Sequence, residues 1–182
     1  MLRARDGDLD AFDELVRRHQ HSALRVAAAV AGASKAEDAT QEGFVRAHRK
    51  LHQYDLDRPF RPWLMRVVAN AARNELRTAG RHRRIERKVQ AAPDRAGSSS
   101  PEDRLSDREI VAAGLARLRP DDRTILALRW FADLSEAEIA DTLGIAKGTV
   151  KSRLNRASKR LRAAIPPTQL ATDEGAPYDA VD

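Results

Sequence analysis

Apolar residues recur every three to four positions along most of the chain, which is the spacing of one face of an α-helix. The first predicted helix begins after Asp8, whose carboxylate can accept a hydrogen bond from the first turn. The second is predicted to begin at Ser34, which forms a capping box with Glu37, and to run to about Leu51. The side of the first helix that we expect to face the core carries Phe12, Leu15, Val16, Leu24 and Val26.

The third predicted helix lies between Pro62 and Gly80. Proline suits the first helical position, because an N–H there would have no hydrogen-bond partner within the helix. Glycine suits the residue just beyond the end of a helix. Residues 54–59 precede this helix as a loop. Beyond Gly80 the apolar period fades, and residues 92–101, which are rich in Ser, Gly and Pro, predict a flexible linker within 81–106.

Four more helices are predicted in the C-terminal half, over residues 107–118, 120–131, 135–143 and 146–164. Ser135 and Glu138 form a capping box for the third of these helices. Gly144 suits the turn that separates it from the last helix. The Pro166-Pro167 pair then ends the helical pattern.

The period of a β-strand occurs nowhere in the chain, so the predicted fold class is all-α. We expect two small helical domains, over residues 1–80 and 107–165, joined by a flexible linker at 81–106. The acidic tail, residues 166–182, is expected to be disordered.

The composition narrows the classes of function. The chain has 182 residues and no cysteine, which excludes disulfide scaffolds, thiolate metal sites and cysteine nucleophiles. No apolar run approaches the roughly 20 residues that span a bilayer, and the N-terminus has no apolar signal-peptide core. We see no carboxylate cluster, Gly-rich phosphate loop or nucleophile arrangement, so we expect no catalytic residue, no metal and no cofactor. These features predict a soluble cytoplasmic protein that is not an enzyme.

The net charge of +6 hides a strong segregation of charge along the chain. Residues 58–92 carry a net +8 and residues 147–162 carry a net +7 with no acid, so all the other residues together carry −9. A solvated helix face is the ordinary explanation of such a run. Two concentrated segments of uncompensated positive charge nevertheless repel themselves unless a polyanion neutralises them, which favours a nucleic-acid partner.

Residues 135–162 have the pattern of a helix-turn-helix. Ala140 is small where the two helices would cross, Gly144 lies at the turn, and Val150 follows as an anchor of the second helix. This second helix separates an apolar stripe from a polar surface that suits phosphates and base edges. The stripe consists of Val150, Leu154, Ala157, Leu161 and Ile165. The candidate DNA-binding residues are Lys147, Thr149, Lys151, Ser152, Asn155 and Arg156.

The helix predicted between Pro62 and Gly80 also has an apolar side and a polar side. Its polar side carries an Arg/Asn stripe made of Arg66, Asn70, Arg73, Asn74 and Arg77. Arg pairs with guanine and Asn with adenine, so this stripe is a second candidate DNA-binding surface. Phe60 and Trp63 could stack on an unpaired base or belong to the core, and the residues leave both interpretations open.

Three segments of the chain resemble the extracytoplasmic-function sigma factors of bacteria, in the sigma-70 family. They are AEDATQEGFVRAHRKL at 36–51, PFRPWLMRVVANAARNELR at 59–77 and LSEAEIADTLGIAKGTVKSRLNRASKRLR at 134–162. Their order and separation are specific in combination, and the resemblance covers about residues 5–80 and 107–164. Because the chain begins almost directly at the first helix of the family, we expect a short N-terminal extension to be missing from this sequence.

The resemblance implies two helical domains that tether RNA polymerase core enzyme to a promoter, with an anti-sigma factor as a further partner. It implies that the polymerase clamp is bound by Asp38, Gln41, Glu42 and Phe44. It implies that the minus-10 element is recognised and opened by Asn70, Arg73, Asn74 and Arg77. It implies that the minus-35 element is read by Lys151, Ser152, Asn155 and Arg156. Residues 36–45 carry three acids and no base, which suits a protein partner rather than DNA.

The chain departs from the family pattern at two places and carries a long connector. The loop at 54–58 lacks the glycine that is often found there, and Ala146 stands where proline is common. The loose connector, residues 81–105, would reach at most about 80–85 Å when extended and about 25–30 Å as a relaxed coil. A tether of this kind does not fix the distance between two promoter elements. We therefore expect polymerase to hold both domains, and the free protein to bind duplex DNA weakly and with strong salt dependence.

Three other classes of protein fit parts of the pattern. A conventional helix-turn-helix regulator shares the C-terminal motif, but a receiver domain would need a parallel α/β pattern that the N-terminal half lacks. An enzyme acting on nucleic acid could use His48 and His52, at helical spacing, as metal ligands, but Arg49 and Lys50 lie between them. A purely structural interaction module would not need the Arg/Asn stripe.

Overall fold

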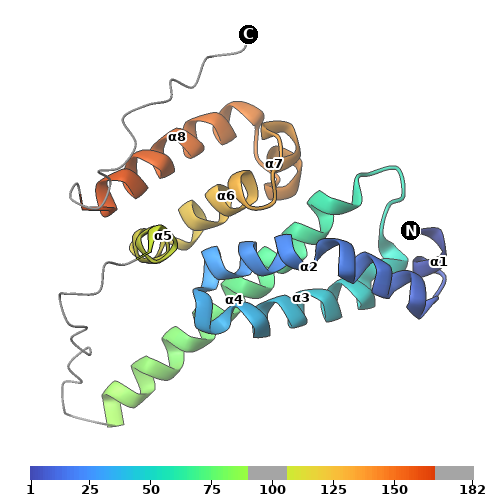
Figure 1. Cartoon of the computed structure of the whole chain (residues 1–182), viewed down its shortest axis with the longest axis horizontal. Helices are drawn as coiled ribbons and strands as arrows, with labels where there is room; N and C mark the ends of the chain where they lie inside the picture. Colours follow the sequence, from blue (N-terminus) through green and yellow to red (C-terminus); the bar gives the residue numbers. More distant parts are fainter. Residues whose placement is uncertain (90–105, 167–182) are drawn as a thin grey trace.

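The computed structural model describes residues 1–89 and 106–166, with side chains over 1–80 and 106–166 (Figure 1). Every regular element in these ranges is a helix, which confirms the all-α prediction. The N-terminal half contains α1 (Leu2–Arg5), α2 (Leu9–Ala31), α3 (Ala36–Lys50) and α4 (Phe60–Val89), with short 3-10 turns η1 (Ala33–Lys35) and η2 (Leu51–Gln53). The C-terminal half contains α5 (Asp107–Ala116), α6 (Pro120–Trp130), α7 (Glu136–Leu143) and α8 (Lys147–Ala164). The tail beyond Pro166 and most of the predicted linker lie outside the described residues.

Three of the predicted helix boundaries are confirmed by their capping contacts. The Asp8 carboxylate accepts a hydrogen bond from the Ala11 N–H at 2.9 Å and caps α2. Ser135 and Glu138 form the reciprocal capping box of α7, with the Ser135 N–H donating to Glu138 Oε2 at 2.8 Å. Gly144 adopts the left-handed conformation, with φ 65°, that glycine tolerates best, and so turns the chain from α7 into α8.

The capping box predicted at Ser34 and Glu37 is wrong. Gly32 ends α2 with a φ of 93°, and the chain closes at once into the 3-10 turn η1, in which the Lys35 N–H donates to the Gly32 carbonyl at 3.2 Å. Ser34 therefore lies inside a turn, whereas an N-cap needs an extended backbone. Helix α3 begins at Ala36 without a side-chain cap.

The predicted ends of the third helix are also wrong. Helix α4 begins at Phe60, two residues before Pro62, and continues through Gly80 to Val89. Pro62 still lies in the first turn, where an N–H has no partner within the helix. Glycine inside a helix costs about 1 kcal/mol relative to alanine, which weakens the helix at Gly80 without ending it.

The N-terminal domain is built on the mutual packing of α2, α3 and α4. Its buried side chains include Val26, Leu64 and Val68. Helices α3 and α4 approach closely at Gly43, where a Cβ atom would lie 2.9 Å from Val68 Cγ2. The absence of a side chain at Gly43 thus sets the distance between these two helices.

The C-terminal domain packs α8 across α6 and α7, with α5 against the end of α8. The predicted apolar stripe of α8 is confirmed, since Val150, Ala157, Leu161 and Ile165 are buried and Leu154 is half-buried. Arg117 donates to the Ala164 carbonyl at 2.7 Å and so holds the C-terminal end of α8. These contacts fix the orientation of the helix whose other side was predicted to meet DNA.

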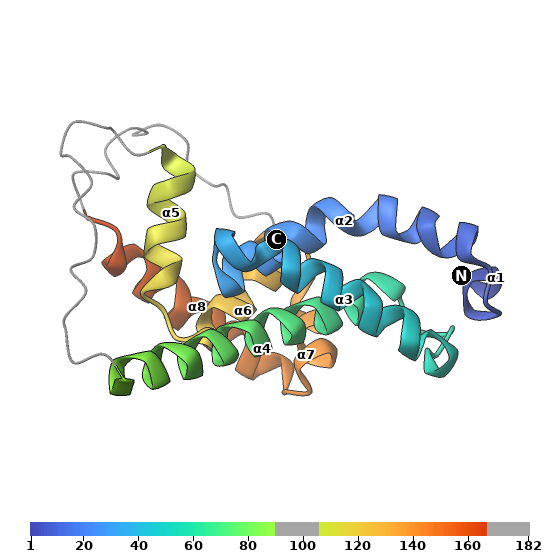
Figure 2. The ribbon, with the colours of Figure 1, turned by 90° about the horizontal axis from the view of Figure 1, so that it is seen from below.

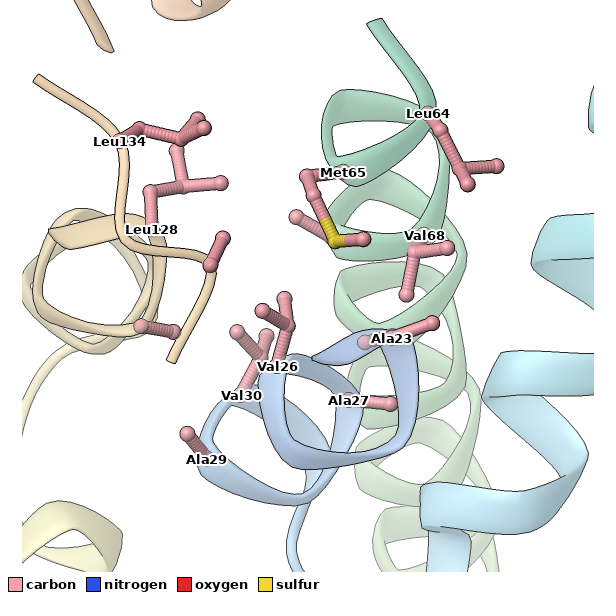
Figure 3. Packing of buried hydrophobic residues seen from close by; sticks show 14 of the residues in the cluster. Ala23, Val26, Ala27, Ala29, Val30, Leu64, Met65, Val68, Leu128 and Leu134 are labelled. Carbon is pink, nitrogen blue, oxygen red and sulfur yellow. The ribbon is translucent and has the colours of Figure 1, made fainter. Parts of the chain in front are cut away.

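The two domains pack directly against each other along an apolar seam (Figure 3). Val26 and Val30 of α2 and Met65 of α4 point toward Leu128 and Leu134 of the C-terminal domain, and all five side chains are fully buried. Helix α6 lies along α2, and α7 lies beside α4 (Figure 2). The chain therefore has one continuous core rather than two separate ones.

Candidate nucleic-acid and polymerase interfaces

Helix α8 presents the predicted recognition surface to solvent. Five of the six candidate side chains are exposed, and Thr149 is half-buried. The exposed ones are Lys147, Lys151, Ser152, Asn155 and Arg156. No acidic residue occurs between positions 147 and 166, so this surface attracts anions without internal competition.

Two side chains of this surface are held by the backbone of α8 itself. Ser152 Oγ donates to the Thr149 carbonyl at 3.0 Å, and Arg156 Nε donates to the Ser152 carbonyl at 3.3 Å. Ala146 at the N-cap offers no side-chain acceptor, so the first N–H groups of the helix are open to an external one. Arg160, on the same helix, instead pairs with Asp122 of α6 at 2.7 Å.

The Arg/Asn stripe of α4 borders the C-terminal domain, although Arg66, Asn70 and Arg77 remain exposed to solvent. Its members Arg66, Asn70 and Arg73 line a cleft of about 110 Å³ between α4 and the C-terminal domain. The opposite wall of the cleft consists of Thr124, Leu128, Thr142 and Leu143. Arg77 lies one turn further along α4 and is exposed, and Asn74 is half-buried. The structure thus brings the stripe together on one side of α4, as predicted, and turns that side toward α6 and α7.

A second, larger cleft of about 340 Å³ lies where the start of α4 meets α7. The α4 side supplies Arg58, Trp63 and Arg66, whereas the α7 side supplies Glu138 and Asp141. Basic and acidic walls therefore face each other across this cleft. The Thr142 hydroxyl, which lines both clefts, is buried and has no hydrogen-bond partner among the described residues.

Two polar contacts join the domains and were not foreseen from the sequence. Arg73 Nη2 lies 2.6 Å from Asp121 Oδ1 at the start of α6. Arg123 of α6 donates from Nη1 to the Val30 carbonyl of α2 at 3.2 Å, and from its other nitrogens to the carbonyls of Ala116 and Leu118. Burial lowers the pKa of Arg123, and these three carbonyls are the acceptors that compensate for its desolvation.

An aromatic cluster stands where the loop at 54–59 meets α4. The ring centroids of Tyr54 and Trp63 are 5.0 Å apart, and those of Phe60 and Trp63 are 5.5 Å apart. The Tyr54 hydroxyl donates to the Arg58 carbonyl, which ties the two ends of the loop together. Burial raises the pKa of Tyr54. Phe60 and Trp63 are half-buried in this cluster, so they form part of the core while Trp63 also borders the larger cleft.

The four residues predicted to bind the polymerase clamp lie on α3 but not in one patch. Gln41 and Phe44 line the groove between α2 and α3. Asp38 is exposed and lies 3.8 Å from Lys35. Glu42 is half-buried and pairs with Arg46 at 2.6 Å. Phe44 itself is only 9% exposed, so it forms the floor of the groove rather than its rim.

The groove between α2 and α3 is bordered by exposed apolar side chains that sequence reasoning missed. Leu9 is 65% exposed, Leu24 is 38% exposed and Val45 is 37% exposed, and all three line the two stretches of this groove. The prediction that Leu24 faces the core is therefore wrong. The helical period places Leu24 on the apolar side of α2, but in the described residues no other helix covers this side at Leu24.

The histidine pair considered as metal ligands is separated by the end of α3. His48 lies in α3 with its ring 4.8 Å from that of Phe12, whereas His52 lies in η2. Over the described ranges, no three His, Asp or Glu side chains gather as a metal site. Each helix in the same ranges is too short or too polar to cross a bilayer.

Comparison with known proteins finds two matching regions in the chain. Residues 15–82 match Sigma-70 region 2, and residues 114–163 match Sigma-70 region 4. The RNA polymerase sigma-H factor of Pseudomonas aeruginosa is 36% identical over 177 residues, with 91% of each chain covered. The ECF RNA polymerase sigma-E factor of Escherichia coli is 32% identical over 175 residues, covering 91% of this chain and 92% of that protein.

A solved structure supports the same relationship. CnrH, in complex with the cytosolic domain of CnrY, superposes with a TM-score of 0.65 and 28% identity, covering 89% of this chain and 92% of that one. The chain belongs to the extracytoplasmic-function sigma factors of the sigma-70 family. It is an alternative sigma factor, which directs RNA polymerase to begin transcription at particular promoters.

Proposed function

We propose that three surfaces of this sigma factor divide the work of promoter recognition. The exposed surface of α8 enters the major groove of the minus-35 element. The Arg/Asn stripe of α4 recognises and helps to open the minus-10 element. The groove between α2 and α3 holds the clamp of the polymerase core enzyme.

The observation that carries this proposal is the two-sided construction of α8. Its buried stripe fixes the helix on α6 and α7, and its exposed polar side chains, which include five of the candidate residues, contain no acid. Asn155 and Arg156 have the donors and acceptors that pair with adenine and guanine edges in the major groove. Lys147 and Lys151 suit phosphates, which position the helix without reading sequence.

The α4 assignment rests on the chemistry of its stripe and on the neighbouring aromatic cluster. Asn70, Arg73, Asn74 and Arg77 follow the helical period on one side of a helix whose opposite side is buried. Single-stranded DNA is bound by cations that track its backbone and by aromatic rings on which bases stack. Trp63, at the edge of the larger cleft, is the ring best placed for such stacking.

The polymerase assignment rests on exposed apolar surface. Leu9, Leu24 and Val45 lie in water in the free protein, and burying each one against a partner is favourable by about 25 cal/mol per Å². Aliphatic side chains of this kind mark protein interfaces rather than DNA contacts. Gln41 lines this groove and Phe44 forms its floor, whereas Asp38 and Glu42 lie on α3 outside the groove and are proposed as further polar contacts of the clamp.

The remaining roles follow from the family. The sigma factor acts in the cytoplasm, where polymerase and promoter DNA are found. It does not catalyse RNA synthesis, because the polymerase catalyses nucleotide addition. An anti-sigma factor is proposed as its regulator. The resemblance to CnrH, which was solved with the cytosolic domain of CnrY, supports a protein partner for this fold.

The test is run-off transcription with purified core polymerase and genomic DNA fragments, combined with a direct core-binding titration. Leu9→Asp should weaken core binding, because it places a charge in the apolar groove while the first turn of α2 tolerates an acid. Leu2→Asp is the matched control, since Leu2 is 59% exposed on α1 and does not line that groove. A protein that fails to bind core enzyme would contradict the proposal, whatever its affinity for DNA.

A further inference from the structure

We infer that the C-terminal domain carries an internal ligand for the DNA-facing side of α4. This acidic edge consists of Asp121 on α6 and Glu138 and Asp141 on α7, and it competes with the minus-10 DNA strand for the same arginines. The inference rests on the proposed role of α4 in binding that strand.

The most direct contact is the ion pair between Arg73 and Asp121. The Nη2–Oδ1 distance of 2.6 Å is that of a charge-assisted hydrogen bond. Arg73 is one of the residues proposed to bind the minus-10 element, and an N–H that donates to a carboxylate is not available to a phosphate. The two residues come from different domains, so the contact exists only while the domains are docked.

The larger cleft repeats this pairing of charges. Arg58 and Arg66 line one wall and Glu138 and Asp141 line the other, with Trp63 at the base-stacking position between them. Carboxylates and phosphates present similar oxygen acceptors to arginine. The acidic edge therefore places oxygen anions opposite the side of α4 along which the phosphates of a DNA strand would lie.

The apolar seam keeps the acidic edge beside the arginines of α4. Val30 and Met65 pack against Leu128 and Leu134 next to these charged groups. On the far side of the seam, Arg25 of α2 lies 4.9 Å from the ring centroid of Phe131, a cation–π contact that again joins the two domains. The carboxylates are thus aligned by buried packing and not by charge alone.

The docking partly covers one DNA surface and leaves the other open. The candidate side chains of α8 point away from the seam and are exposed, whereas Arg66, Asn70 and Arg73 face the C-terminal domain. The docked protein is therefore competent for duplex contacts through α8, whereas α4 has Arg73 engaged by Asp121 and its other arginines beside the acidic edge, which weakens strand capture. Holoenzyme formation then separates the domains and frees these arginines for the minus-10 element.

The test compares two full-length variants that remove the same number of charges. The interface variant, Asp121→Asn with Glu138→Gln and Asp141→Asn, neutralises the acidic edge, and Gln keeps the α7 capping box because it also accepts from the N-cap. The control, Asp10→Asn with Asp13→Asn and Asp133→Asn, neutralises three carboxylates outside both clefts. Thermal unfolding of both variants checks that each one folds.

Two measurements follow each variant. The first is the affinity for a fluorescent single-stranded minus-10 oligonucleotide. The second is the distance between dyes on cysteines introduced at the exposed residues Gln53 and Ala163, which is specific because the chain has no cysteine of its own. We expect the interface variant to bind the strand about 3- to 30-fold more tightly than the control, from loss of competing ion pairs, and to show a population with a changed dye distance.

Each outcome decides the inference. Equal affinity gains in the two variants would mean that net charge alone acts, and would overturn it, as would an unchanged dye distance. A changed dye distance without a gain over the control would overturn the competition and show that docking and DNA binding are independent. Adding Arg77→Ala to the interface variant tests the role of α4 separately, because Arg77 lies outside both clefts. If this variant loses strand binding, the assignment of α4 to the minus-10 element is supported independently of the competition.

Discussion

Replacing Gly43 with alanine tests how closely α3 must lie on α4. A Cβ atom at this position would lie 2.9 Å from Val68 Cγ2 and 3.1 Å from Val68 Cα. Carbon atoms in favourable contact are about 3.5–4 Å apart, so the helices would have to separate by several tenths of an ångström. Val68 is fully buried and the second contact is with backbone, so neither atom can move aside by a simple rotation.

Two opposing effects decide the sign of the change. Alanine is more favourable than glycine in a helix interior by about 0.8–1.0 kcal/mol. Inserting a carbon into a packed core typically costs about 1–3 kcal/mol. We expect the packing cost to win, with a net loss of about 1 kcal/mol and a fall in Tm of about 2–4 °C for a chain of this size with one continuous core.

Gly80→Ala is the matched control, because Gly80 also lies inside a helix but a Cβ there would meet no atom within 4 Å. It should show only the helix-propensity gain, so its Tm should rise. Thermal unfolding followed by circular dichroism measures both variants, and a core-polymerase titration should show weaker binding for Gly43→Ala, since α3 forms one wall of the proposed clamp groove. A Gly43→Ala protein as stable as Gly80→Ala would refute the packing argument.

Three further predictions concern DNA reading, phosphate contact and pH. Arg156→Ala should remove about 1–3 kcal/mol of discrimination at one base pair of the minus-35 element, measured on matched and mismatched duplexes, while core affinity stays unchanged; equal loss of both would contradict the division of labour. Lys151→Gln should weaken binding to all duplexes alike and reduce the slope of log K against log salt by about 0.9, and an unchanged slope in fluorescence anisotropy would exclude a phosphate contact. Burial, aided by Arg61 and Arg18, lowers the pKa of His19 from its ordinary 6.5, so the unfolded chain takes up this proton first. Stability should then be full above about pH 6.5 and decline below it, and in urea unfolding at several pH values His19→Gln should show a smaller decline, whereas an equal decline would assign the effect to other groups.

The helix-turn-helix could be predicted from sequence because its determinants are local. Ser135, Glu138 and Gly144 lie within ten positions, and each acts on the backbone beside it. The exposed surface of α8 followed from the same logic, since helical period alone separates it from the buried stripe. The capping box predicted at Ser34 was wrong, because Gly32 turns the chain into a 3-10 turn before the extended backbone of an N-cap can form.

The docking of the two domains could not be predicted in this way. Arg73 and Asp121 are 48 positions apart, and 33 basic and 27 acidic residues offer too many possible pairs for composition to select one. The exposure of Leu24 is a similar case, because period identifies the apolar side of a helix but not how far its neighbours extend. The three-dimensional arrangement of the domains decides both features.

The coverage of the α4 arginines by the C-terminal domain also bears on how the free factor moves through a crowded nucleoid. A genome offers about 10⁶–10⁹ competing non-specific sites, and affinity for them grows with each phosphate a protein can neutralise. With Arg73 paired to Asp121, the free chain has one cation fewer for phosphates on α4 and loses part of that affinity. More of the factor then diffuses unbound and is available for capture by polymerase, so the full positive surface is deployed only at the enzyme that needs it.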